Sequence, residues 1–368
     1  GETVRDSVAH VAMGADAINF FQWRASAFGA ESFHSAMVPH AGEHTKLYRS
    51  VCALGAALKT LGDAGVQGSE LVRSDTAILF SAESEWATRS ETLPSKKLNH
   101  WHDVRDWYRA YLDAGTRADI VPLKYDWSGY ATVVLPTVLM LSAADTARLE
   151  RFVRDGGTVV VGYASGLIDE NFHTWLGGYP GAGDGMLRTM LGIRGEEFNI
   201  LGAQAEGEPS EIRLSNGMVT RLWQNDIAVD GADTEVLASY AGTQADEWDL
   251  DGTAAITRNP YGKGMAYFVG CDLNVADLAV FVGDHLTAGR ACEAGDGADY
   301  DPTITLHTER ASAEAIFDFY LPRGKNETVV SGISGEPVYR FQCDEGEAPG
   351  VYTIRRNGVL VVKRYNRQ

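Results

Sequence analysis

The chain has 368 residues, with 32 Lys and Arg against 50 Asp and Glu, a formal net charge of −18 and a pI near 4.9. Phosphate-binding surfaces need clustered basic side chains, so this acidic balance argues against a nucleic-acid or anionic-membrane partner. No run of apolar residues approaches the roughly 18–20 that cross a bilayer. Domains usually contain about 100–200 residues, so the length predicts two or three of them.

The cysteines are scattered and show no Cys-x-x-Cys spacing: Cys52, Cys271, Cys292 and Cys343. A zinc knuckle or a disulfide framework needs closer clustering. We therefore expect reduced thiols, a cytoplasmic protein, and neither a metal nor a cofactor.

Residues 1–72 read as a helix, a strand, a loop and a second helix. Val8 and Val11 share a helical face that Gly14 ends, residues 17–21 (AINFF) form an apolar run typical of a strand, and leucines spaced by three or four positions predict a helix over residues 45–61. This order is the repeating unit of a (β/α)₈ barrel, whose functional loops follow the strands. One unit cannot close a barrel, so residues 1–72 cannot form a complete barrel by themselves.

Residues 73–290 alternate apolar strands with amphipathic helices. Strands are expected at residues 76–80, 120–123, 131–135, 158–161, 253–257 and 265–269, and helices over residues 104–112, 142–153 and 275–286. The last two strands flank a turn-rich connector at residues 259–264. This alternation predicts an α/β domain with a doubly wound parallel sheet and helices on both faces.

Residues 291–368 predict a small antiparallel β domain, which follows a segment with the composition of a linker (residues 288–301). Its strands are expected at residues 303–308, 316–321, 327–330, 338–342, 350–355 and 359–364. Asn357 and Gly358 between the last two strands form the clearest hairpin signal in the chain.

The stretch from Gly14 to Gly42, GADAINFFQWRASAFGAESFHSAMVPHAG, contains the segments FFQWR, G-A-E-x-F-H and M-V-P-H-A-G in this order. Together they resemble the last barrel strand and loop of glycoside hydrolase family 42, a family of β-galactosidases. The resemblance continues through residues 77–181 and, more weakly, to the C-terminus. It implies the C-terminal portion of a retaining β-galactosidase acting on terminal galactosides. Residues 1–72 would then be the C-terminal remnant of the catalytic barrel, with roughly seven barrel units absent before residue 1. The middle domain of this family resembles a class I glutamine amidotransferase and mediates homotrimer contacts.

The resemblance also indicates which residues touch the substrate. The two catalytic glutamates of the family follow the fourth and seventh barrel strands and would lie in the missing N-terminal part, so we expect no catalytic residue in this chain, and no activity from it alone. Glu31 and His34 match the family's galactose-binding positions, where a carboxylate and an imidazole hydrogen-bond sugar hydroxyls. Trp23 and Phe33 would line the sugar, although both are equally compatible with a place in the core.

Three other interpretations compete with this one. Glu31, His34, His40 and His44 are close enough in sequence for a metal site, but Pro39 and Gly42 interrupt any helix that would join them. A non-enzymatic, trimerising assembly module with a relic barrel unit is the alternative from another class of protein.

Amidotransferase chemistry is the third alternative. It needs a cysteine nucleophile on a tight turn after a strand, and no cysteine lies between Cys52 and Cys271. The serine in Gly162–Gly166 (GYASG) stands one position away from the serine of a G-x-S-x-G motif. The sequence therefore argues against a hydrolytic site at Ser165.

Overall fold

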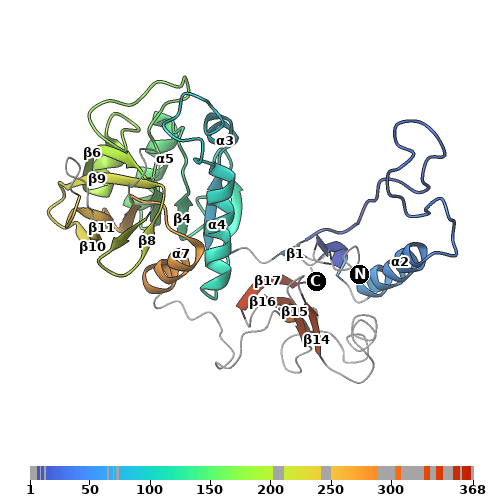
Figure 1. Ribbon diagram of the computed structural model, residues 1–368. Helices are drawn as coiled ribbons and strands as arrows, with labels where there is room; N and C mark the ends of the chain where they lie inside the picture. The colour runs from blue at the N-terminus through green and yellow to red at the C-terminus, as the bar shows by residue number, and fades with distance from the viewer. Residues whose placement is uncertain are drawn as a thin grey trace. The chain divides into compact units, whose positions relative to one another are not determined.

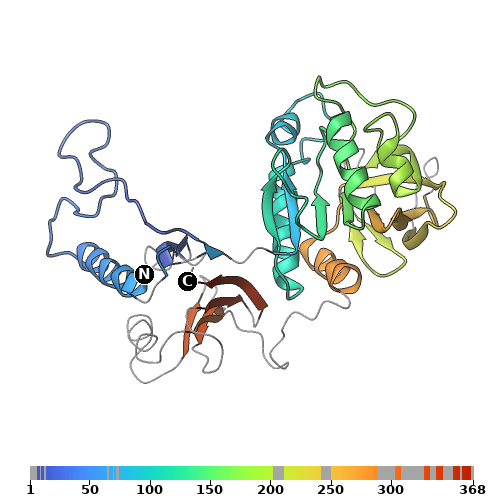
Figure 2. The same ribbon diagram turned by 180° about the vertical axis from the view of Figure 1, so that it is seen from behind.

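The computed structural model describes residues 6–8, 10–11, 14–63, 66–68, 70–71, 74–201, 211–241 and 250–287, together with the backbone of strands between residues 303 and 365. The chain forms two compact units (Figures 1 and 2). One consists of residues 74–291, and the other combines residues 1–73 with residues 292–368. None of the helices in the described residues is long and apolar enough to span a membrane.

A nine-stranded mixed sheet organises the unit of residues 74–291. Its strands are β2 (Thr76–Phe80), β3 (Asp119–Pro122), β4 (Thr132–Leu135), β5 (Thr158–Gly162), β7 (Ile212–Leu214), β8 (Val219–Thr220), β10 (Glu235–Ala241), β11 (Ala254–Tyr261) and β12 (Gly264–Val269). They are ordered β3-β2-β4-β5-β12-β11-β10-β7-β8. The pairs from β3 to β12 are parallel, as predicted, and the pairs from β12 to β8 are antiparallel. A separate ribbon pairs β6 (Ile193–Ile200) with β9 (Trp223–Val229).

Helices cover both faces of the parallel strands. They are α3 (Ala82–Ala87), α4 (His100–Asp113), α5 (Ala143–Arg154), α6 (Met186–Leu191) and α7 (Val275–Phe281), which continues into a π-helical turn over Val282–Leu286. Ile78 and Val134 pack with α4 and α7, which lie side by side in both views (Figures 1 and 2). Leu79 and Leu135 pack with α5 and α6 on the other face. Burial on both faces explains why these strands are unbroken apolar runs.

Side-chain caps begin several of these helices. The Ser142 hydroxyl accepts the Asp145 N–H at 3.1 Å, as the sequence predicts for α5. Asn99 accepts the His102 N–H at 2.9 Å and begins α4 in the same way. Each cap satisfies a donor that would otherwise lack a partner in the first turn.

The connector predicted at residues 259–264 is shorter than expected. Asn259 and Pro260 belong to β11, and only Gly262 and Lys263 separate it from β12. The Asn259 side chain donates to the Met190 carbonyl at 2.9 Å and accepts the Thr234 hydroxyl at 3.0 Å. These long-range hydrogen bonds hold a turn-forming residue type within a strand.

The N-terminal part of the other unit follows the sequence prediction except at its expected strand. Residues 6–8, 10 and 11 are helical, and α2 spans Lys46–Asp63. The Gly14 N–H donates to the Val11 carbonyl at 3.0 Å, with φ of +111°, as expected where a helix ends. Residues 17–21 form no strand, because no residue in the described part of the chain pairs with them.

A six-stranded sheet completes this unit. Its strands are β1 (Glu70–Leu71), β13 (Thr303–His307), β14 (Glu327–Ser331), β15 (Pro337–Gln342), β16 (Val351–Arg356) and β17 (Val359–Tyr365), in the order β1-β17-β16-β13-β15-β14. The sequence predicts an antiparallel sheet, and this prediction is wrong at one pair: β13 and β15 are parallel.

Parts of the prediction for the C-terminal sheet lie outside the described residues. These parts are the linker at residues 288–301, the strand at residues 316–321 and the Asn357-Gly358 pair. The flanking strands β16 and β17 are antiparallel, with Arg356 opposite Val359, and this register agrees with a hairpin. The three-domain division at residues 72 and 290 stays a prediction.

Gly264 provides a test of the packing between β12 and the turn before β5. A Cβ at this position would lie 2.1 Å from the Gly157 oxygen and 2.3 Å from the Val153 oxygen, and these backbone atoms cannot rotate away. We expect Gly264→Ala to lower the free energy of unfolding by about 1–3 kcal/mol, measured as a lower urea midpoint of tryptophan fluorescence. Gly283→Ala is the control, because its Cβ would meet no atom within 4 Å. Equal midpoints for the two variants would contradict this packing.

Candidate functional site

A loop closed at its neck carries the residues that the sequence indicates as substrate contacts. Arg24 and Val38 form a parallel β-bridge. The Ala25 N–H donates to the Val38 carbonyl at 3.0 Å, and the Val38 N–H donates to the Trp23 carbonyl at 2.7 Å. Residues 24–38 therefore form a loop whose ends meet, which we call the 24–38 loop. Loops of this type frequently carry function.

Glu31 and His34 lie on the exposed part of the 24–38 loop. The His34 N–H donates to the Glu31 carbonyl at 3.0 Å, so one turn contains both residues. Gly29 precedes them with φ of +88°, a conformation that glycine adopts without strain. Their side chains have no hydrogen-bond or ion-pair partner among the described residues. Both side chains are therefore available to a ligand.

Large aromatic side chains are exposed on and beside this loop. Phe33 is 96% exposed and Trp23 is 60% exposed, so the structure places both at the surface. The Trp23 ring meets Tyr48 of α2 edge-on, with centroids 6.5 Å apart. Phe21 and Phe28 are exposed as well. Several exposed aromatic side chains within a short segment are a feature that binding sites share.

The histidines that suggested a metal site are not arranged as ligands. His40 Nε2 donates to the Ser26 carbonyl at 2.7 Å, and both His40 and His44 precede the start of α2 at Lys46. The described residues contain no group of three or more His, Cys, Asp or Glu side chains that could hold a metal ion.

The turn after β5 contains the GYASG segment that was compared with the G-x-S-x-G motif. Its strained residue is Ala164, with φ of +54°, and alanine supplies no nucleophile. The Ser165 hydroxyl donates to the Leu135 carbonyl at 3.1 Å and accepts the Val138 N–H at 2.9 Å. Ser165 thus holds two loops together, in agreement with the argument against a hydrolytic site here.

His100 also has a structural role at this edge of the sheet. Its Nε2 accepts the Ser81 N–H at 2.9 Å, which leaves Nδ1 to donate to the Pro136 carbonyl at 2.8 Å. Burial lowers the pKa of His100 to about 4, so the imidazole is neutral near pH 7. Because both ring nitrogens are committed, His100 has no free position for general acid or base catalysis.

Asp103 is the titratable centre of the same region. Thr137 and Tyr163 both donate their hydroxyls to Asp103 Oδ2, the latter at 3.0 Å. Part of Asp103 reaches the surface at the start of α4, whereas its carboxylate lies inside. Burial raises the pKa of this carboxyl to about 7 and outweighs the opposing effect of the two hydroxyl donors.

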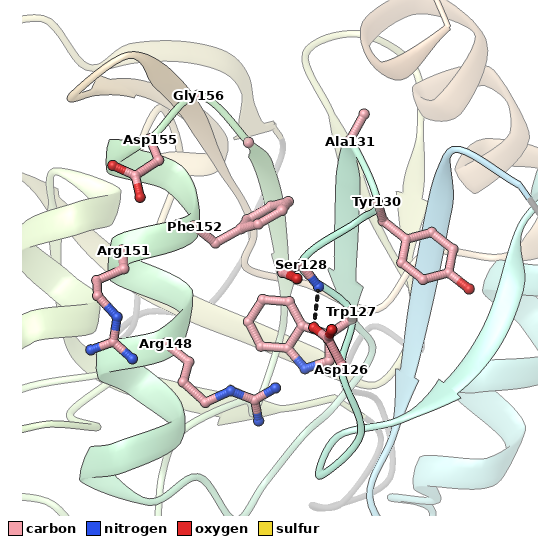
Figure 3. Close-up of a pocket in the computed structure, with 11 residues that line it drawn as sticks. Asp126, Trp127, Ser128, Tyr130, Ala131, Arg148, Arg151, Phe152, Asp155 and Gly156 are labelled. Carbon is pink, nitrogen blue, oxygen red and sulfur yellow. Dashed lines mark hydrogen bonds between the residues drawn. The ribbon is translucent and has the colours of Figure 1, made fainter.

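A cavity of about 470 Å³ lies at the opposite edge of the sheet, between α5 and the loop before β4 (Figure 3). Arg148 on its wall donates to the carbonyls of Leu123 and Tyr125, at 3.1 and 2.8 Å, and its guanidinium lies 4.6 Å from the centroid of Trp127. Trp127 is itself only 2% exposed and packs edge-on against Phe152. These groups stabilise the fold, and ligands of open α/β sheets bind at the other, carboxyl edge.

Two family models match this chain, and one of them covers the 24–38 loop. Residues 1–61 match the family described as β-galactosidase, and residues 74–290 match the family described as β-galactosidase trimerisation domain. The chain belongs to glycoside hydrolase family 42. The 24–38 loop and α2 thus lie in or beside the segment matched to the β-galactosidase family, and the nine-stranded sheet lies in the trimerisation domain.

Individual members of family 42 are similar over most of the chain. β-Galactosidase BbgII of Bifidobacterium bifidum is 42% identical over 371 residues, which cover 99% of this chain and 51% of that protein. The structure of a β-galactosidase from Rahnella sp. R3 is 29% identical, with a TM-score of 0.69, over 81% of this chain and 43% of that one. A structure from Bacillus circulans sp. alkalophilus is 26% identical, with a TM-score of 0.68, over 98% and 51%. The chain spans about half the length, or less, of the curated relatives that it matches.

Sequence reasoning did not single out every feature of this family 42 loop. Phe21 and Phe28 are strongly exposed, although an apolar residue type alone would place them in a core. Ser26 and His40 form a hydrogen bond between positions 14 apart, which no local pattern indicates. For Phe21 and Phe28, the sequence signal of exposure was the high density of aromatic residues around a polar, glycine-containing segment.

Asp103 predicts a specific pH dependence of stability. The ordinary pKa of an Asp carboxyl is near 3.8, so between about pH 4 and 7 the folded state binds one more proton than the unfolded state. The stabilisation is fully present below the unfolded pKa and is lost as the pH rises through 7. We expect Asp103→Asn, whose amide keeps an acceptor for both hydroxyls, to gain stability relative to the parent as the pH rises from 4 to 8. Urea unfolding at several pH values measures this difference, and parallel stability curves would contradict it.

Proposed function

We propose that this chain is part of a retaining β-galactosidase that hydrolyses terminal β-D-galactosides. In this proposal, Glu31 and His34 hydrogen-bond galactose hydroxyls, and Trp23 and Phe33 cover the apolar face of the sugar. The acid/base and nucleophile glutamates are proposed to belong to the part of the family enzymes that this chain does not match. The observation that supports the proposal most directly is the pair of unpartnered, exposed polar side chains on an aromatic loop within the β-galactosidase match.

The chemistry of these side chains suits a sugar. A carboxylate accepts hydrogen bonds from two adjacent hydroxyls, and an imidazole donates from one nitrogen while it accepts at the other. Exposed rings beside them provide the apolar surface that C–H groups of a pyranose pack against. Glu31, His34 and Phe33 offer these groups within four consecutive positions.

Residues 74–290 are proposed to provide the contacts of a homotrimer, supported by their match to the trimerisation domain. A non-enzymatic assembly module remains the alternative, and this same match favours it. We also propose a cytoplasmic location, supported by the free thiols of Cys52 and Cys271. The two functions differ in whether Glu31 affects catalysis, and the experiments below distinguish them.

The first test uses the chain alone. A retaining glycosidase needs two carboxyl groups about 5–5.5 Å apart, and the proposal places neither of them here. We expect the purified chain to release no measurable nitrophenol from nitrophenyl β-D-galactoside. Turnover above that of a mock purification would contradict the proposed position of the catalytic pair.

The second test asks whether Glu31 contacts the sugar. We expect a chimera, in which this chain replaces the matching half of B. bifidum BbgII, to hydrolyse the same substrate. Loss of a charged hydrogen bond costs about 1.5–3 kcal/mol, so Glu31→Gln should lower kcat/KM by about 10- to 100-fold. Glu43→Gln, an exposed glutamate outside the 24–38 loop, is the matched control and should leave kcat/KM unchanged. An active chimera that Glu31→Gln does not impair would remove Glu31 from the sugar-binding site, whereas an inactive chimera would support the assembly module.

A further inference from the structure

The neck of the 24–38 loop continues beyond its backbone hydrogen bonds. The parallel bridge pairs Arg24 with Val38, an offset of 14 positions. Ser26 and His40 have the same offset and lie two positions further along the two parallel segments. Their contact is not a backbone rung, because it is the His40 imidazole that donates to the Ser26 carbonyl, at 2.7 Å. A side chain thus adds one hydrogen bond between the two segments beyond the backbone bridge.

Ser26 also has a hydrogen-bond partner within the segment that enters the loop. Its hydroxyl donates to Gln22 Oε1 at 3.4 Å, and the Gln22 carbonyl accepts the Met37 N–H at 2.9 Å. The segment that enters the loop is therefore tied to the segment that leaves it at both Gln22 and Ser26. The His40 bond holds Ser26, from which the chain continues to the turn that carries Glu31 and His34.

We propose that His40 is a positioning residue, whose bond to Ser26 fixes the base of the 24–38 loop and so holds Glu31 and His34 in their sugar-binding positions. This inference rests on the proposed function. Precise placement matters because hydrogen bonds weaken steeply with misalignment, and a displaced carboxylate cannot contact two adjacent hydroxyls at once.

The donor role of His40 defines what a substitution must preserve. Nε2 carries a proton both in one neutral tautomer and in the imidazolium, so either form of the ring maintains the bond. His40→Ala removes the donor. His40→Gln places an amide N–H at a similar distance from the backbone and can restore it. His44→Ala is the control, because the His44 side chain is exposed and has no hydrogen-bond partner among the described residues.

The first measurement is amide hydrogen exchange in the full chain. A neutral hydrogen bond contributes about 1 kcal/mol, which corresponds to about a fivefold change in protection. We expect His40→Ala to lower protection at Ala25 and Val38 by about this factor, and His40→Gln and His44→Ala to retain it. Unchanged protection at these two amides in His40→Ala would overturn the proposal.

The second measurement is the kinetics of the BbgII chimera. We expect His40→Ala to raise KM for nitrophenyl β-D-galactoside by about three- to tenfold with a smaller change in kcat, and His40→Gln to restore KM. If KM is unchanged in His40→Ala while kcat/KM is lowered in Glu31→Gln, the positioning role of His40 is refuted and the proposed function is not. A raised KM that His40→Gln does not restore would also refute it, since the donor would not be the cause. An unimpaired Glu31→Gln enzyme would refute the proposed function, and the positioning role with it.

Discussion

The loops that follow β2, β4 and β5 are largely buried, and their backbone groups must therefore find hydrogen-bond partners inside the protein. Side chains meet this demand: His100 joins the loops after β2 and β4, and Ser165 joins those after β4 and β5. Asp272 accepts the N–H groups of Leu222 and Trp223 in the same way, at 2.7 and 2.6 Å. A histidine, a serine and an aspartate at the carboxyl edge of an α/β sheet would ordinarily suggest catalysis. Here the buried backbone occupies their donors and acceptors.

In the 24–38 loop, unlike the loops that follow the parallel strands, the backbone groups bind one another and the side chains of the predicted site residues do not bind any described backbone group. Backbone groups close its neck, while Glu31 and His34 keep their side-chain donors and acceptors free in the described part of the chain. Both residues were predicted only through the family resemblance, because a lone Glu-x-x-His occurs on many surfaces. The closed neck depends on pairing between Arg24 and Val38, which local sequence patterns do not reveal.

Fold prediction succeeded where local patterns determine the structure. The apolar runs of β2, β4 and β5, the periodic face of α4 and the Ser142 cap can all be read within a few neighbouring residues. It failed where distant partners determine the structure. Asn259 lies in a strand because Met190 and Thr234 bind its side chain, and residues 17–21 are apolar but lack a paired neighbour in the described residues. The strand β9 was missed because Gln224, Asn225 and Asp226 interrupt its apolar pattern, although Gln224 and Asn225 are buried.

The pairing of β1 with β17 makes residues 74–291 an insertion between two pieces of one unit, since Glu70 lies opposite Tyr365 and Leu71 opposite Arg364. Bringing such distant residues together costs loop-closure entropy, and that cost is greatest while the intervening chain is flexible. A folded insertion has few conformations left to lose. The inserted unit contains its own sheet and cores, so it can fold during synthesis, before the last strand leaves the ribosome. The six-stranded sheet, in contrast, is complete only after β17 has been synthesised.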